Sequence, residues 1–144
     1  MTAERLETAS EEETMAAGSR LATRLTPGDV VLLYGDLGAG KTAFVRGMAS
    51  AFGASPDDVS SPTFTLVQEY RGGRALLYHV DLYRLEPHEV DDLGLEEIAG
   101  EDGIVAVEWA ERWRRRPHDA WEVQIDHAAG DRRSIEIVPP PRPA

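Results

Sequence analysis

Short apolar runs alternate with polar and amphipathic stretches along the chain, and this alternation predicts strands and helices in turn. Val30–Tyr34 consists wholly of apolar residues, which is typical of a strand buried on both faces of a sheet. Ile104–Glu108 has the same character up to its last residue. Two further pairs of segments predict hairpins: residues 64–70 with 75–81 around a turn at 71–74, and residues 121–126 with 133–138.

Helix signals fill the intervals between these strands. Ser10 and Glu13 have the spacing of a capping box, which predicts a helix that begins there and runs to about Leu25. The remaining predicted helices cover residues 41–52, 88–99 and 109–115.

The order of these elements predicts an α/β domain. A buried strand that leads through a loop into a helix needs a parallel neighbour, whereas the two hairpins add antiparallel strands. We therefore expect one mixed central sheet with helices on both faces. The length of 144 residues fits a single domain. We place this domain at residues 1–138, followed by a proline-rich tail at 139–144 that we expect to be disordered.

The composition narrows the possible partners. No apolar run approaches the ~20 residues that a membrane-spanning helix needs, and the acidic start of the chain is unlike a signal peptide. We therefore expect a cytoplasmic protein with no membrane partner. The chain has no cysteine, which excludes disulfides, thiol catalysis and cysteine-ligated metals. Its net charge of -11 repels nucleic acid, so we expect no DNA partner and no direct binding of RNA.

One basic cluster interrupts this acidic balance, at Arg112, Arg114, Arg115 and Arg116. It can be a nucleic-acid contact or a solvated helix end, since cations are favourable near a helix C-terminus. Charge runs more often form solvated faces, which favours the second interpretation.

Lysine is almost absent from the chain. Of the 15 basic residues all but Lys41 are arginine, and asparagine is missing altogether, as a GC-rich coding bias would explain. A compact ammonium differs from a planar guanidinium in size and hydration. The lysine that the chain keeps therefore indicates a site that arginine cannot serve.

A phosphate-binding loop contains that lysine. The segment reads Gly35-Asp36-Leu37-Gly38-Ala39-Gly40-Lys41-Thr42 and matches the Walker A pattern at every position. Its glycines let successive N–H groups point at phosphates, and the following helix N-terminus adds partial positive charge. We expect Lys41 to reach the β- and γ-phosphates and Thr42 to ligate Mg²⁺. The expected fold is therefore P-loop NTPase-like.

Two acids that end apolar strands can complete a magnesium site. Asp81 and Glu108 could each hold the metal through water, and each could orient the attacking water. Chain order favours Asp81, because it resembles the order in small GTPases, whereas the segment at Trp109 looks like a switch that follows Glu108. Thr63 lies where a residue that senses the γ-phosphate is expected, although a plain turn is the alternative.

The identity of the nucleotide base and the type of reaction follow from motifs that the chain lacks. The guanine-reading segment Asn-Lys-x-Asp is absent, which favours ATP over GTP. Small-molecule kinases also use this loop, but a kinase needs an acceptor pocket and a lid, for which the chain is short. A nucleotide-sensing adaptor without turnover is the other alternative. No two histidines have metal-ligand spacing, so we expect His79, His88 and His127 to be ordinary residues.

Three segments together resemble one family. They are the loop at 35–42, Ser-Pro-Thr-Phe-Thr-Leu-Val-Gln-Glu-Tyr at 61–70, and Tyr-His-Val-Asp-Leu-Tyr-Arg-Leu at 78–85, with Glu108-Trp109 completing the set. The chain resembles, over roughly residues 10–138, the TsaE (YjeE) family of small bacterial ATPases needed to make threonylcarbamoyladenosine (t6A) in tRNA. It departs from that family mainly at Gln68-Glu69 and in the arginine-rich stretch after Trp113.

The resemblance implies a role, partners and site residues. It implies a weak, partner-stimulated ATPase that acts as a nucleotide switch on the TsaD–TsaB pair, which modifies adenosine 37, with tRNA met only through that complex. It gives magnesium and hydrolysis roles to Asp81 and Glu108. It also implies catalytic roles for Lys41 and for Thr63, which lies in a switch-like loop. The residues expected near the base or the nucleotide are Glu11, Thr14 and Arg133.

Overall fold

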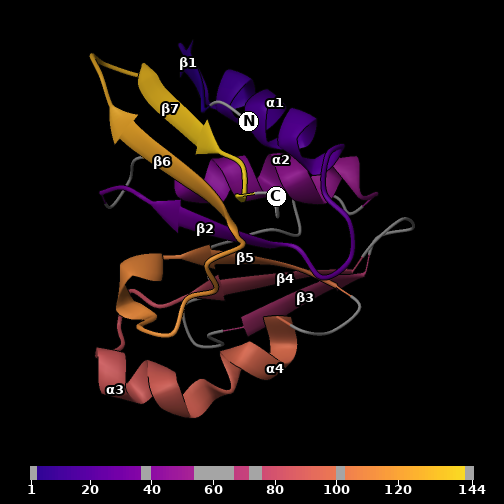
Figure 1. Ribbon diagram of the computed structural model, residues 1–144. Helices are drawn as coiled ribbons and strands as arrows, with labels where there is room; N and C mark the ends of the chain where they lie inside the picture. The colour runs from indigo at the N-terminus through magenta and orange to yellow at the C-terminus, as the bar shows by residue number, and fades with distance from the viewer. Residues whose placement is uncertain (1–2, 37–39, 54–66, 72–75, 100–102, 142–144) are drawn as a thin grey trace.

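The computed structural model describes residues 3–36, 40–53, 67–71, 76–99 and 103–141. A seven-stranded sheet forms its centre, in the order β1-β7-β6-β2-β5-β4-β3 (Figure 1). The strands are β1 (Glu4–Thr8), β2 (Val30–Tyr34), β3 (Val67–Arg71), β4 (Leu76–Asp81), β5 (Ile104–Glu108), β6 (Trp121–His127) and β7 (Arg133–Val138). The helices are α1 (Glu11–Ala22), α2 (Lys41–Ala51), α3 (Pro87–Val90) and α4 (Leu95–Ala99), with 3₁₀ turns η2 (Asp91–Leu93) and η3 (Ala110–Arg112).

The middle of the sheet is parallel and its margins are antiparallel, so the predicted mixed sheet is confirmed. β2 lies between β5 and β6 and runs parallel to both, and β4 continues the parallel group beside β5. β3 pairs antiparallel with β4, and β7 pairs antiparallel with both β6 and β1. Because four neighbouring strands share one direction, their carboxyl ends meet at the same edge, which is where open α/β sheets bind ligands.

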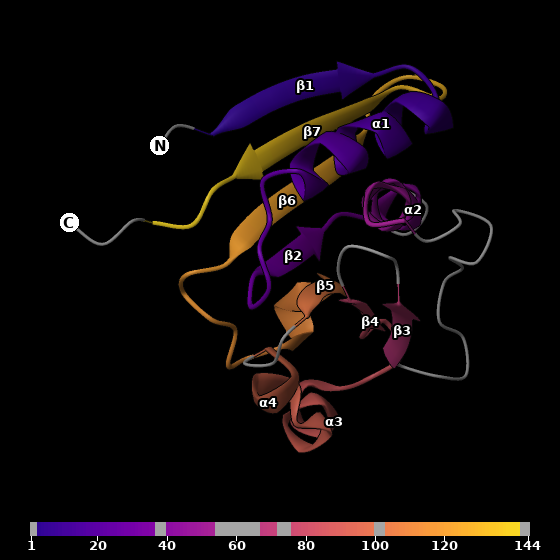
Figure 2. The same cartoon turned by 90° about the vertical axis from the view of Figure 1, so that its right-hand side faces the viewer.

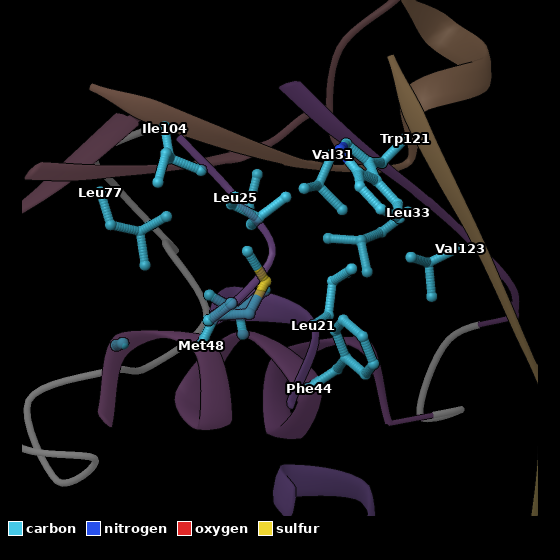
Figure 3. Close-up of a cluster of buried hydrophobic side chains, with 14 of the residues drawn as sticks. Leu21, Leu25, Val31, Leu33, Phe44, Met48, Leu77, Ile104, Trp121 and Val123 are labelled. Atoms are coloured by element: carbon cyan, nitrogen blue, oxygen red, sulfur yellow. The ribbon is translucent and has the colours of Figure 1, made fainter. Parts of the chain in front are cut away.

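Alternate residues of the sheet serve two separate cores. Val31 and Leu33 of β2 pack with α1 and α2, whereas Leu32 packs with the side that carries α3, α4 and η3. Figure 3 shows the first core, in which Phe44 and Met48 of α2 face the apolar side chains of the sheet. Helices therefore cover both faces, as predicted from the order of elements (Figures 1 and 2).

α1 and α2 pack backbone against backbone because each offers a glycine to the other. A Cβ on Gly18 would lie 2.0 Å from the carbonyl oxygen of Phe44, and one on Gly47 would lie 1.8 Å from that of Met15. These distances leave no room for any side chain at either position. The first helix is thereby fixed against the helix that follows the phosphate-binding loop.

The predicted cap of α1 is confirmed, but three predicted helix boundaries are wrong. The Ser10 hydroxyl accepts a hydrogen bond from the Glu13 N–H at 3.2 Å, and α1 ends at Ala22, short of the predicted end. The helix predicted over 88–99 is broken into α3, η2 and α4, because Gly94 adopts a left-handed conformation with φ of 72°. The helix predicted over 109–115 is reduced to η3, because Trp109 is also left-handed, with φ of 58°.

The sequence analysis did not predict β1. This strand lies at one margin of the sheet and pairs with β7, placing Leu6 opposite Ile135. Its sequence, Glu-Arg-Leu-Glu-Thr, has a single large apolar residue, so no local pattern distinguishes it from a polar leader. Its conformation depends on a partner from the other end of the chain.

Two predictions fall wholly or partly outside the described residues. The strand predicted from residue 64 is described only from Val67, and the turn at 71–74 lies almost entirely outside. Pro139 is buried and residues 142–144 lie outside the described part, so the disordered tail stays a prediction. Within the described ranges, no helix is long and apolar enough to cross a membrane.

Candidate nucleotide-binding site

The phosphate-binding motif lies at the carboxyl edge of the parallel strands. Gly35 and Asp36 follow β2 directly, and Gly40 leads into α2 at Lys41. Gly35 has φ of 139° and Gly40 has φ of 106°, a region that side chains with a Cβ rarely enter. The strand–loop–helix context that the motif requires is therefore present. Leu37, Gly38 and Ala39 lie outside the described residues.

Lys41 is buried beneath its own loop. Its side chain is part of a residue only 4% exposed, and its ammonium donates to the carbonyl oxygens of Gly35 and, at 3.0 Å, Asp36. The ring of Trp109 covers the same ammonium, with Nζ 4.2 Å from the ring centroid. Burial lowers the pKa of Lys41, while the negative charge of Glu108 acts in the opposite direction. A buried cation held by neutral groups is ready to pair with an anion.

Glu108 joins the loop to the neighbouring strands. It ends β5, is 3% exposed, and accepts a hydrogen bond from the Thr42 hydroxyl at 3.2 Å. The same carboxylate oxygen lies 2.5 Å from Nε2 of His79, which is fully buried on β4. We expected His79 to be an ordinary residue and did not predict this contact with Glu108. The sequence signal available was its position two residues before Asp81, which puts both on one face of a strand.

Asp81 lies beside Glu108. The two residues are opposite each other in the β4–β5 register, and the carboxylate of Asp81 accepts a hydrogen bond from the Tyr83 N–H at 3.0 Å. Burial raises the pKa of Asp81; the Tyr83 N–H opposes this shift, and the charge of Glu108 adds to it. Two neighbouring carboxylates and one hydroxyl form an oxygen-rich group that a divalent cation would neutralise.

These donors suit Mg²⁺ better than they suit a metal whose ligands all come from the protein. Within the described residues, no group of three or more His, Cys, Asp or Glu side chains is arranged to hold a metal. Mg²⁺ usually takes one or two carboxylates, waters and phosphate oxygens rather than a protein cage. Thr42, Glu108 and Asp81 match that pattern.

Trp109 covers the ammonium of Lys41, and Tyr83 packs against the Trp109 ring. Trp109 follows Glu108 in a left-handed conformation, and it is the one residue other than glycine with a positive φ in the described part of the chain. Its ring lies 5.0 Å from that of Tyr83, which is 41% exposed, and 5.9 Å from the guanidinium of Arg112. Sparsely populated backbone conformations tend to occur at functional sites.

The structure brings some of the residues expected near the base to the loop. A Cβ built on Gly40 would lie 3.6 Å from a methyl of Thr14 and 3.8 Å from Nε of Arg133. Glu11 instead pairs with Arg46 of α2 at 2.9 Å. Thr14 and Arg133 thus flank the loop, while Glu11 lies one turn before Thr14 on α1. Thr63 lies outside the described residues, so its expected sensing role is not tested.

A family model and several relatives match this chain. The model of the threonylcarbamoyl adenosine biosynthesis protein TsaE matches residues 8–135. The chain belongs to the TsaE family. Its sequence is 45% identical to the TsaE protein of Nostoc sp. over 91% of this chain and 83% of the relative, and 43% identical to that of Bacillus subtilis over 91% and 82%. The crystal structure of Bacillus subtilis YdiB superposes with a TM-score of 0.78 at 35% identity, covering 94% of this chain and 84% of the other.

The arginine-rich stretch of this TsaE-family chain serves its own fold. Arg112 donates to the carbonyl oxygen of Leu85 at 2.7 Å, and Arg114 pairs with Asp91. Arg116 donates to three carbonyl oxygens around η3, the closest at 2.9 Å, from residues Ala110, Glu111 and Trp113. These bonds fix the segment after Trp109. They favour a structural role over a nucleic-acid contact, although the expected regular helix is absent.

Proposed function

We propose that the chain is an ATP-binding and ATP-hydrolysing accessory protein of bacterial t6A modification at adenosine 37 of tRNA, acting in the cytoplasm as a nucleotide switch on the TsaD–TsaB complex. Membership of the TsaE family supports the pathway. The observation that carries the ATPase assignment is the contact between the Thr42 hydroxyl and the Glu108 carboxylate, 3.2 Å apart, at the end of the phosphate-binding loop. Such a hydroxyl and carboxylate are the usual protein ligands of the nucleotide's Mg²⁺.

The loop residues would each contact a different part of the nucleotide's phosphates. Gly35 to Thr42 would wrap the phosphates with backbone N–H groups, and Lys41 would exchange its two carbonyl partners for phosphate oxygens. An anion is the stronger partner for an ammonium, which supports this exchange. Thr14 and Arg133 would flank the nucleotide on the side of α1, with Glu11 near the base.

Asp81 and Glu108 would divide the remaining chemistry. A Mg²⁺ ion held there would supply positive charge to offset that of the phosphates. Thr42 and one of the two acids would hold the metal, and the other acid would orient the attacking water. Which acid does which stays open, because both end neighbouring strands at the same edge.

A nucleotide switch requires an element that differs between two states. Trp109 supports such a switch, because its ring rests on the ammonium that ATP would engage. Movement of this ring would change the surface formed with Tyr83 and offered to TsaD–TsaB. We propose the loop at Thr63 as a second sensing element.

Product analysis with the partners present tests the proposal. Wild type should release ADP and free phosphate without any acceptor. Glu108→Gln and Asp81→Asn should still bind nucleotide but turn over about a hundredfold more slowly, since each loses the charge that holds metal or water. Glu97→Gln, an exposed acid of α4, is the matched control and should behave as wild type.

Three other results would count against the proposal. Phosphate that appears only on an added small molecule would indicate the kinase. Tight binding without turnover would indicate the adaptor. Normal turnover in both acid variants would overturn the assignment of the carboxylates.

A further inference from the structure

The imidazole of His79 is placed to hold the carboxylate of Glu108. It lies on β4, is wholly buried, and belongs to the face of the sheet that packs against α2. Its Nε2 is 2.5 Å from the carboxylate of Glu108. Tyr70 is its aromatic neighbour, with ring centroids 6.5 Å apart. A histidine in such a core needs a polar partner, because burying an unpaired polar group is costly.

The surroundings of Nδ1 determine which group donates in the hydrogen bond between His79 and Glu108. Nδ1 of His79 has no hydrogen-bond partner within the described part of the chain. A proton on Nδ1 would therefore be buried without an acceptor. The proton belongs on Nε2, so that the ring donates to Glu108.

Within the described residues Glu108 has two hydrogen-bonding partners, Thr42 and His79, and only His79 has no other role in the proposed reaction. The Thr42 hydroxyl donates to the same carboxylate oxygen at 3.2 Å. In the proposed site the oxygen of that hydroxyl would also ligate the metal, so its orientation is set by the metal as well as by Glu108. His79 has no such second task, and its ring is held by the packing of β4 between β3 and β5.

We infer that His79 is a positioning residue that fixes the Glu108 carboxylate for its part in ATP hydrolysis, an inference that rests on the proposed function. A glutamate has three side-chain torsions and needs such support to keep one orientation. Groups that orient a ligating carboxylate typically contribute ten- to a hundredfold to metal affinity or activity. Loss of the His79 contact should therefore lower turnover and leave the binding of phosphate by Lys41 unchanged.

Two substitutions of similar polarity separate positioning from packing. The amide nitrogen of glutamine reaches the position of Nε2, whereas that of asparagine reaches only the position of Nδ1. His79→Gln should keep most of the turnover measured with TsaD–TsaB, and His79→Asn should lower kcat by about ten- to a hundredfold with ADP affinity within about twofold of wild type. His118→Gln, at an exposed histidine, is the control and should match wild type. Equal loss in both His79 variants, or loss of ADP affinity together with kcat, would overturn the inference.

A spectroscopic measurement tests the same contact without any turnover. The other three histidines are exposed, so an imidazole N–H that exchanges slowly with water should belong to His79. Its proton resonance should be shifted downfield in wild type and in His118→Gln, and absent from Glu108→Ala, which removes the acceptor. Persistence of the shifted resonance in Glu108→Ala would overturn the inference. Absence of turnover in wild type would instead count against the proposed function, and the resonance would then decide the inference alone.

Discussion

Lys41 is held by groups of its own chain in the same places where a nucleotide would bind. The carbonyl oxygens of Gly35 and Asp36 accept from its ammonium, and the face of Trp109 covers it. The three groups hold the buried side chain in place, and within the described residues no carboxylate forms an ion pair with its ammonium. The lysine is therefore preorganised for an anion, and the same packing explains why a larger cation would not fit.

Lys41→Ala should reduce ATP affinity on the order of a hundredfold or more, because it removes a buried charge that would face the phosphates. Lys41→Arg should also bind more weakly than wild type, since a planar guanidinium cannot occupy the space between the loop carbonyls and the Trp109 ring. Titration calorimetry with ATP and Mg²⁺ measures both. Arg20→Ala, at the exposed end of α1, is the control; wild-type affinity in Lys41→Arg would refute the argument from the single lysine.

The half-buried acid Asp81 should make stability depend on pH. Burial raises its pKa, so the folded chain binds this proton more tightly than the unfolded chain. Stability then falls as pH rises from the unfolded pKa of about 3.9 through the higher folded pKa, and the loss is complete above the latter. Asp81→Asn should therefore be more stable than wild type at pH 7, with the difference shrinking towards pH 4. Urea denaturation without nucleotide at both pH values measures this.

A matched acid serves as the control for that experiment. Asp92 is exposed in η2, and Asp92→Asn should show no comparable gain at pH 7. If Asp81→Asn is less stable than wild type at both pH values, the carboxylate is a net stabilising group and the assignment of its environment fails.

At the scale of elements, the contact between α1 and α2 connects the two sides of the nucleotide site. α1 carries Thr14, α2 begins with Lys41 and Thr42, and Gly18 and Gly47 bring the two backbones together. Thr14, on the proposed base side, and the start of α2, on the proposed phosphate side, are therefore held at a fixed spacing by two positions that no side chain can occupy.

Gly18→Ala and Gly47→Ala should each destabilise the fold by about 3 kcal/mol or more, because the helices must separate to admit a methyl group. Gly94→Ala is the matched control: its φ of 72° strains the new residue, but nothing lies closer than 4.0 Å. It should cost only about 1–2 kcal/mol. Chemical denaturation ranks the three variants, and equal costs would show that the helices adjust without penalty.

The turn after β5 should report on nucleotide binding. Trp109 is partly exposed and rests on Lys41, whereas Trp113 and Trp121 are buried in the two cores. The intrinsic fluorescence should change when ATP and Mg²⁺ bind, and Trp109→Phe should remove most of the change. A full signal in Trp109→Phe, or none once Trp113 and Trp121 are replaced by Phe, would show that this turn is static.

Prediction from the sequence succeeded where one segment determines its own structure. β2, the loop and α2 follow from a local apolar run and a local motif, and the hairpin of β6 and β7 follows from alternation. It failed where structure depends on a distant partner: β1 needs β7, and the left-handed Trp109 needs the packing around it. The same holds for the site, because His79 and Glu108 are 29 residues apart and meet only through the pairing of β4 with β5.

At the scale of the whole molecule, the net charge of -11 governs which partners can approach. Arg112, Arg114 and Arg116, three of the four arginines that might have formed a basic patch, are used by the fold around η3. The surface therefore favours proteins over nucleic acid as direct partners.

The isolated chain should not bind tRNA measurably at physiological salt, and it should associate with TsaD–TsaB in a way that depends on nucleotide. Equal affinity in both nucleotide states would shift no equilibrium, so the ATP and ADP forms must differ. Filter binding measures the first expectation, and a pull-down with ATP, ADP or neither measures the second. Lys41→Ala should lose the nucleotide effect and Arg20→Ala should keep it. Tight tRNA binding by the chain alone, or partner binding that ignores nucleotide, would overturn the switch.

The position of β6 has a consequence for the order of events during synthesis. β2, which leads into the phosphate-binding loop, takes one neighbour from β5 and the other from β6, which begins only at Trp121. A nascent chain halted before that point would leave β2 as an open edge with half its ladder unmade. Such edges are prone to wrong pairings. The proposed ability to bind ATP would therefore be among the last properties that the chain acquires as it leaves the ribosome, even though the loop itself emerges early.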